Sequence, residues 1–180
     1  PPARRPSKKP AGWTRGLEAR NLGEGARQNP ARKTPMAEFR LDARLAADST
    51  PVAELPLSSL RLMNDRRYPW AILAPRRAGL VEIFDLSSAD LRILADEITI
   101  VSKALSTVTA AHKMNVAALG NLVRQLHVHV VARREDDEAW PHPIWGRGEM
   151  SPWPGDEGAV LAAQLAAAVS ASPSGSSARG

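Results

Sequence analysis

The stretch Gln125-Leu126-His127-Val128-His129-Val130-Val131 decides how the fold of this chain is interpreted. Polar and branched apolar residues alternate in it, and a period of two sends successive side chains to opposite faces of a β-strand. Gln125, His127 and His129 therefore share one predicted face, while the apolar residues between them face a core. Histidine changes its charge near neutral pH, so two imidazoles on one face indicate a site.

Outward from this stretch, the pattern of residues 36–134 predicts several strands and one long helix. The first expected strand begins over residues 39–45, is interrupted by a turn at 48–51 and resumes over 52–57. The others cover residues 60–63, 70–74, 114–119 and 122–132, with a tight hairpin turn at Gly120-Asn121. Ser87 followed by Asp90 predicts a helix start, and apolar residues then recur at three- and four-residue steps to Ala110. The fold class is therefore α+β: an antiparallel sheet of about five strands with one long helix packed on it.

The two ends of the chain differ in composition from this middle part. Residues 1–35 contain 9 Lys+Arg and 2 Asp+Glu without a periodic apolar pattern, so we expect a disordered basic leader there. Two explanations of the leader stay open: translation from an over-long gene with Met36 as the natural start, or a basic arm that contacts RNA or an anionic surface. A short alanine-rich helix is expected over 155–170, followed by a disordered tail over 171–180.

Composition also excludes several classes of protein. The chain has no cysteine, which excludes disulfides, thiolate zinc sites and a cysteine nucleophile, and fits the reducing cytoplasm. No apolar run reaches the roughly 20 residues of a membrane span, so no membrane partner is expected. The net charge of +5 comes from the leader, because residues 36–180 carry 15 basic and 17 acidic side chains. Nucleic acid is therefore not the expected partner of the folded part.

Three chemistries could use the face that carries the two histidines. Two histidines at alternate strand positions can chelate one cation, but a stable metal site needs a third ligand such as His112 or His142. Both rings could instead be hydrogen-bonded groups of the core. Finally, a neutral imidazole can attack phosphorus when its other nitrogen donates to a backbone carbonyl.

The same segment resembles the signature strand of the histidine-triad (HIT) superfamily, in which His-x-His-x-His is followed by apolar residues. The order of strands, the Asn64-Asp65 turn and the helix after Ser87 are similar as well, so the resemblance covers roughly residues 36–134. It implies a HIT-like fold, with residues 36–154 as the catalytic domain. The relatives that it resembles are bacterial nucleotide hydrolases of the diadenosine polyphosphate hydrolase type.

The resemblance implies a role for each residue of the signature. In its register His127 would attack the α-phosphorus of a nucleotide and form a covalent intermediate, and His129 would hydrogen-bond the phosphoryl oxygens. Gln125 occupies the position of the family's first histidine. An amide can donate a hydrogen bond, but it cannot lend a proton as an imidazolium can, which puts help for the leaving group in doubt.

Further nucleotide-binding residues are implied by position. Asp65, or Asn64 beside it, falls at the turn where relatives bind ribose hydroxyls, although a turn cap explains the pair equally well. Asn121 falls near a phosphate-contacting position, although a hairpin turn also explains it, and Asn115 is a weaker candidate. The tryptophan-rich loop over 135–154 either closes over the site or packs onto the domain.

The expected function is that of a nucleotidyl hydrolase or transferase. Its substrate would be a purine nucleotide substituted at the α-phosphate, such as a dinucleoside polyphosphate or a nucleoside phosphoramidate. No cofactor is required, although Mg²⁺ could accompany a polyphosphate. The resemblance also implies a two-fold homodimer joined through the long helix and a sheet edge. Two alternatives stay open: a nucleotide-binding regulatory protein with little turnover, and a metal-dependent enzyme that uses His127 and His129 as ligands.

Overall fold

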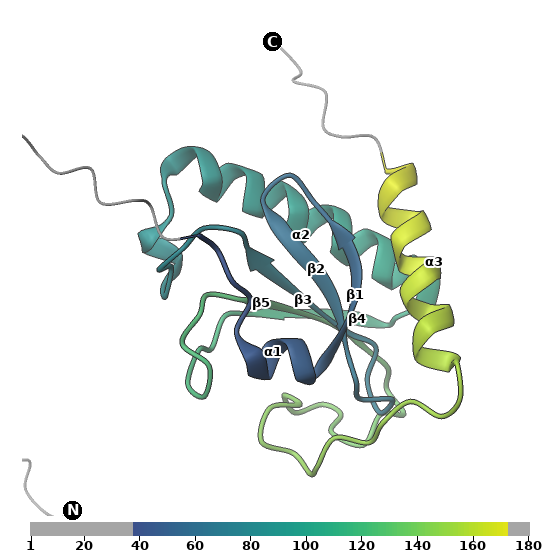
Figure 1. The fold of residues 1–180 in the computed structure, drawn as a ribbon. Coiled ribbons are helices and arrows are strands. Elements are labelled where there is room, and N and C mark those ends of the chain that lie inside the picture. Colours follow the sequence, from purple (N-terminus) through teal and green to yellow (C-terminus); the bar gives the residue numbers. More distant parts are fainter. Residues whose placement is uncertain (1–37, 173–180) are drawn as a thin grey trace, which may run out of the picture. The chain divides into compact units, whose positions relative to one another are not determined.

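The computed structural model describes residues 38–172. The expected leader over 1–35 and all but the first two residues of the expected tail over 171–180 lie outside the described residues. A five-stranded antiparallel sheet forms its centre (Figure 1). The strands are β1 (Ser49–Glu54), β2 (Ser58–Met63), β3 (Trp70–Pro75), β4 (Lys113–Ala117) and β5 (Val128–Arg133). They lie side by side in the order β1-β2-β3-β5-β4. The strand of the histidines is therefore an inner strand, between β3 and the edge strand β4.

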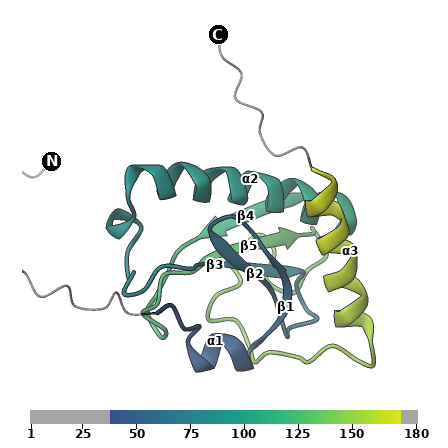
Figure 2. The same cartoon turned by 45° about the horizontal axis from the view of Figure 1, so that its top comes forward.

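The long helix α2 (Ser88–Thr109) covers one face of this sheet (Figure 2). It begins as the sequence predicts, because the Ser87 hydroxyl accepts a hydrogen bond from the Asp90 amide at 3.0 Å. It ends at Ala110, which adopts the left-handed conformation with φ 50°. A single turn of 3₁₀ helix, η1 (Ile83–Asp85), precedes it. The expected long helix is confirmed.

Glu97 fixes this helix to the sheet. The carboxylate is buried, and its Oε1 accepts hydrogen bonds from the backbone amides of Leu57 at 2.6 Å and Ser58 at 3.2 Å. The Leu57 amide belongs to the connection that leads into β2, and Ser58 is the first residue of that strand. One acidic side chain on an otherwise apolar helix face thus accepts from two buried backbone N–H groups, which would otherwise lack a hydrogen-bond partner.

The two faces of β5 pack against different layers. Leu126, Val128 and Val130 belong to the main core beneath α2. Val131, on the other face, packs with Tyr68 and Ile144 in a smaller cluster. The alternation predicted from the sequence is confirmed, and it places His127 and His129 on the face away from α2.

That second face is covered by the short helix α1 (Ala43–Ala47) and by the loop of residues 135–154 (Figure 2). The C-terminal helix α3 (Glu157–Ala171) packs against α2 and β1 through Ala162, Leu165 and Val169. No helix among residues 38–172 is both long and apolar enough to span a bilayer.

Two local predictions were wrong. Residues 39–45 do not form a strand: Asp42 caps α1 by accepting from the Arg44 amide at 2.8 Å, and β1 begins at Ser49, where a turn was expected. The hairpin turn at Gly120-Asn121 is also wrong, since residues 118–127 form an irregular connection between β4 and β5. The Leu126 amide in that connection donates to the Leu80 carbonyl and not to a strand partner.

Candidate active site

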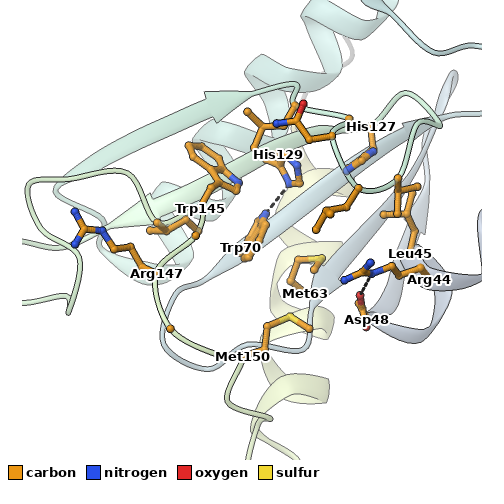
Figure 3. Close-up of a pocket in the computed structure, with 18 of the residues that line it drawn as sticks. Arg44, Leu45, Asp48, Met63, Trp70, His127, His129, Trp145, Arg147 and Met150 are labelled. Atoms are coloured by element: carbon orange, nitrogen blue, oxygen red, sulfur yellow. Dashed lines mark hydrogen bonds and ion pairs between the residues drawn. The ribbon is translucent and has the colours of Figure 1, made fainter.

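His127 and His129 line a cavity of about 580 Å³ on the face of the sheet away from α2 (Figure 3). Its volume falls within the roughly 300–1,000 Å³ typical of small-molecule sites. Four parts of the chain form its walls: α1 with its flank, strands β2, β3 and β5, the 118–127 connection and the 135–154 loop. Side chains from these parts include Arg44, Leu45, Met63, Trp70, Asn121, Trp145 and Arg147.

The hydrogen bond of His127 assigns its tautomer. The ring is 6% exposed, and its Nδ1 lies 2.7 Å from the backbone oxygen of Gln125. A carbonyl oxygen can only accept, so the hydrogen belongs to Nδ1. In the neutral ring Nε2 then carries a lone pair, which is the arrangement that a nucleophilic imidazole needs.

His129 has the opposite tautomer. Trp70 Nε1 lies 3.0 Å from its Nδ1, and an indole nitrogen can only donate, so Nδ1 accepts and the hydrogen belongs to Nε2 (Figure 3). Burial, and secondarily the neighbouring His127, lower the pKa of His129 to about 3. The ring is therefore neutral near pH 7. The centroids of the two imidazoles lie 4.7 Å apart, with their planes at 78°.

Trp145 brings a further donor to the cavity from the 135–154 loop. Its ring centroid lies 5.7 Å from that of His129 (Figure 3). The indole Nε1 is buried and has no hydrogen-bond partner among the described residues. A buried indole N–H normally has a partner, so this donor next to His129 in the cavity wall is unusual among the described residues.

A buried ion pair fixes the start of this loop. Arg133 is 1% exposed, and its guanidinium donates to both carboxylate oxygens of Asp137 at 2.7 and 2.9 Å. Its Nη1 also donates to the side-chain oxygen of Asn115 at 2.7 Å. Burial raises the pKa of Asp137, but the hydrogen bonds from Arg133 and the backbone outweigh it, and the net pKa is lowered.

A second pair fixes the end of the loop. Asp65 is fully buried and accepts hydrogen bonds from the Arg67 guanidinium and, at 3.2 Å, from the Ser151 amide. Arg67 Nη1 donates in turn to the backbone oxygen of Arg147 at 2.9 Å. Burial opposes ionisation of Asp65, yet the hydrogen bonds from Arg67 and the two backbone amides prevail and lower its pKa.

The structure brings His127, His129 and Asn121 together in the cavity wall. It places Gln125 elsewhere: its Oε1 accepts from the Asp42 amide at 2.9 Å and its Nε2 donates to the Arg40 oxygen at 2.8 Å. The amide thus holds the segment before α1 and does not line the cavity. The physical reason is that the alternation persists back to Leu126 and His127 but ends there, and the Gln125 amide is instead held by the backbone of residues 40 and 42.

The other three predicted nucleotide-binding side chains also lie outside the cavity wall. Asn115 is bound to Arg133, and Asn64 accepts from the Thr50 hydroxyl at 2.9 Å. Asp65 accepts from the Arg67 amide at 3.2 Å, which is the geometry of the turn cap that the sequence left open. These partners occupy the polar atoms that a ribose would need.

Trp70 is a site residue that sequence reasoning missed. Its position follows from strand pairing: Trp70 lies opposite Val131, so its side chain shares a face with His129 and lies diagonal to it. No sequence signal gives that register. The tryptophan-rich loop was a signal for Trp145, and both interpretations of that loop apply, because Trp145 lines the cavity while Ile144 packs onto the domain.

Comparison with known proteins agrees with this fold. A family model described as the HIT domain matches residues 44–136. A histidine triad protein from Sinorhizobium meliloti 1021 is 50% identical, with 71% of this chain and 94% of that chain covered and a TM-score of 0.69. Histidine triad proteins from Bradyrhizobium japonicum (41% identity, 74% and 99% covered, TM-score 0.72) and Marinobacter aquaeolei VT8 (39%, 74% and 98%, 0.72) are similar as well.

No curated protein matched the chain. The family model spans more than half of the sequence, and the matched structures reproduce the fold over nearly their whole length. The resemblance inferred from the signature strand is thereby confirmed: the chain belongs to the histidine triad (HIT) family.

Proposed function

We propose that this protein is a nucleotidyl hydrolase or transferase in which His127 attacks the α-phosphorus of a nucleotide substrate. The observation that carries the proposal is the hydrogen bond from His127 Nδ1 to the Gln125 oxygen, 2.7 Å long, at the wall of a cavity of about 580 Å³. It leaves Nε2 as the nucleophilic atom, and the cavity volume suits a nucleotide.

The reaction divides into two displacements. In the first, the Nε2 lone pair forms an N–P bond, the bond from phosphorus to the leaving group breaks, and its electron pair leaves with that group. The positive charge on the substituted ring is stabilised by the Nδ1–H that donates to the carbonyl of Gln125. In the second, water or another acceptor attacks phosphorus, the N–P bond breaks, and the electron pair returns to Nε2. The proton of the attacking water goes to solvent.

Neutral donors and nearby cations support the phosphoryl group in this proposal. His129 Nε2–H and Trp145 Nε1–H can each bind a phosphoryl oxygen, because neither has a hydrogen-bond partner among residues 38–172 that would compete. Arg44 and Arg147 in the cavity wall draw an anionic substrate towards the site.

The test is to trap the intermediate. Full-length protein is mixed briefly with diadenosine tetraphosphate or the 4-nitrophenyl ester of adenosine 5′-phosphate, quenched and digested, and its peptides are weighed. We expect one added adenylate on His127, and neither adduct nor turnover in His127→Asn. His112→Asn is the matched control, because that ring is half exposed and lies outside the cavity wall. Wild-type turnover in His127→Asn would overturn the proposal.

A regulatory nucleotide-binding protein is the second candidate, and the position of Gln125 favours it, since the family's first histidine has no functional equivalent in the cavity. Calorimetric binding of the same nucleotides without any product would support it. The metal-dependent alternative has less support, because residues 38–172 contain no cluster of three potential metal ligands. Mg²⁺ is proposed only as a companion of polyphosphate substrates, so adduct formation on His127 should persist in chelator.

We further propose a two-fold homodimer formed through the free edge of β4. Within the described residues this strand pairs only with β5, and Val116 on it is 46% exposed. An unpaired strand edge is a ready template for a second chain. Light scattering should give twice the chain mass of 19.4 kDa, and Val116→Lys should lower it to that of one chain. A single-chain mass for the wild type would contradict the dimer.

A further inference from the structure

Among the described residues that line the cavity, no side chain is able to protonate a leaving group. The residue that replaces the family's first histidine, Gln125, has both amide atoms bound to the segment of residues 40–42, outside the cavity. The remaining titratable or charged side chains in the cavity wall are Arg44, Asp48, Arg67, Arg147, His127 and His129. Arginine does not release a proton near neutral pH, and Asp48 is ion-paired with Arg44.

His127 cannot serve as the acid while it acts as the nucleophile. Its Nε2 forms the bond to phosphorus, and its Nδ1–H donates to the backbone oxygen of Gln125. Transfer of that proton would leave the substituted ring neutral and remove the hydrogen bond that stabilises its charge. The proton therefore stays on Nδ1 through the first displacement.

His129 is excluded by its bond to Trp70. The indole Nε1–H donates to Nδ1 at 3.0 Å. A second proton on this buried ring would lie on Nδ1, where two N–H donors would face each other without an acceptor. The ring therefore keeps its single hydrogen on Nε2, and a neutral imidazole is a hydrogen-bond donor but a very weak acid.

We propose that this site acts on nucleotides whose leaving group departs as a stable anion without a proton donor, and that Trp70 is the positioning residue that imposes this through His129. Phosphate, polyphosphate, carboxylate and acidic aryl oxide leaving groups meet the condition. The inference rests on the proposed function. The bond from phosphorus to the leaving oxygen breaks with its electron pair on that oxygen, and no proton moves. An amine leaving group would have to depart as an amide anion, so nucleoside phosphoramidates are poor substrates.

The first experiment measures how the rate depends on the leaving group. Full-length protein is assayed with 4-nitrophenyl, 4-chlorophenyl and phenyl esters of adenosine 5′-phosphate, and with adenosine phosphoramidate. General-acid catalysis contributes about 10²–10⁴-fold, so we expect kcat/KM for the phenyl ester and the phosphoramidate to lie below that for the nitrophenyl ester by at least about that factor. Equal rates across the series would show that an acid is present and overturn the inference while leaving the proposed function intact. No turnover of any ester would overturn both.

The second experiment measures the protonation state and tautomer of His129 directly. We expect nitrogen NMR of the wild type to show a neutral ring with hydrogen on Nε2 across about pH 5–8, the interval in which an ordinary histidine titrates. Titration of His129 in that interval would overturn the inference, whatever happens to the variants.

The third experiment removes the indole donor. Trp70→Phe keeps an aromatic ring but removes the donor that competes for Nδ1. Burial still lowers the pKa of His129, so we expect that pKa to rise above its wild-type value and an acid-dependent rate for the phenyl ester to emerge at the acidic end of the pH profile. The matched control is Trp153→Phe, which loses an indole hydrogen bond to the Met63 oxygen of 3.0 Å but lies outside the cavity wall. The same leaving-group dependence and pH profile in both variants would refute the role of Trp70.

Discussion

Asp65→Asn separates two roles that this carboxylate could have, ribose ligand or structural anchor. The carboxylate is fully buried and pairs with Arg67 at 2.7 Å. Removal of one partner of a buried ion pair costs about 3–5 kcal/mol. Asparagine retains one oxygen for the amides of Arg67 and Ser151, so we expect the lower end, a loss of about 3 kcal/mol in the free energy of unfolding. At roughly 4 °C per kcal/mol, the Tm should fall by about 12 °C.

The assay is urea and thermal unfolding followed by circular dichroism, with KM for diadenosine tetraphosphate measured in parallel well below the lowered Tm. Asp136→Asn is the matched control, because Asp136 also pairs with an arginine, Arg134 at 2.9 Å, but with both side chains exposed. It should leave stability unchanged within error, since exposed pairs contribute little. Wild-type stability of Asp65→Asn with a raised KM would refute the structural role and assign Asp65 to the substrate.

Three further predictions concern acid stability, the segment before α1 and the loop that carries Trp145. The pKa values of Asp65 and Asp137 are lowered in the folded state, so their stabilisation is complete above the unfolded value of about 3.9 and is lost as the pH falls below it. Urea unfolding from neutral to acidic pH should show this loss, with a smaller slope in Asp65→Asn; an identical slope would contradict it. Gln125→Ala removes two hydrogen bonds to residues 40–42 and should lower the free energy of unfolding by about 1–2 kcal/mol. Hydrogen exchange at the Asp42 amide should become faster, and unaltered exchange would contradict the contact. Gly148→Ala, at φ +62°, would place its Cβ 2.7 Å from Arg67 Nη1, whereas the Cβ of Gly146→Ala, at φ +80°, would meet nothing within 4 Å. The backbone strain of about 1–2 kcal/mol is common to both variants, so Gly148→Ala should lower the free energy of unfolding more. Equal Tm values would disprove the clash.

The sequence predicted most of the regular structure because periodicity reports burial. The helix after Ser87 and the strands β2 and β3 are long enough, and buried enough, for their apolar pattern to be unambiguous. The helix α1 has only five residues, fewer than two turns, so its pattern could not be distinguished from a strand. Its one available signal was Asp42, a good N-cap residue.

The site was predictable only in part, for a related reason. The histidines were found because strand alternation acts locally, whereas the contacts that set their tautomers come from elsewhere: Trp70 from a neighbouring strand and the carbonyl of Gln125 from an irregular connection. The Gln125 side chain was assigned to the wrong surroundings because the alternation, which still holds at His127, was extended to residue 125, whose amide is bound by the backbone of residues 40 and 42. Register and loop geometry depend on the whole fold, and single-sequence patterns do not contain them.

The two arginine–aspartate pairs at either end of the 135–154 loop have a consequence for how the proposed activity would respond to temperature. They hold the 135–154 loop in place over the imidazoles before any ligand binds. The conformational entropy of this loop is therefore lost during folding and not at each binding event. A preorganised loop favours tight binding of the ligand and leaves little role for closure of the loop upon binding. Heating that loosens either pair should therefore abolish activity before the sheet itself melts.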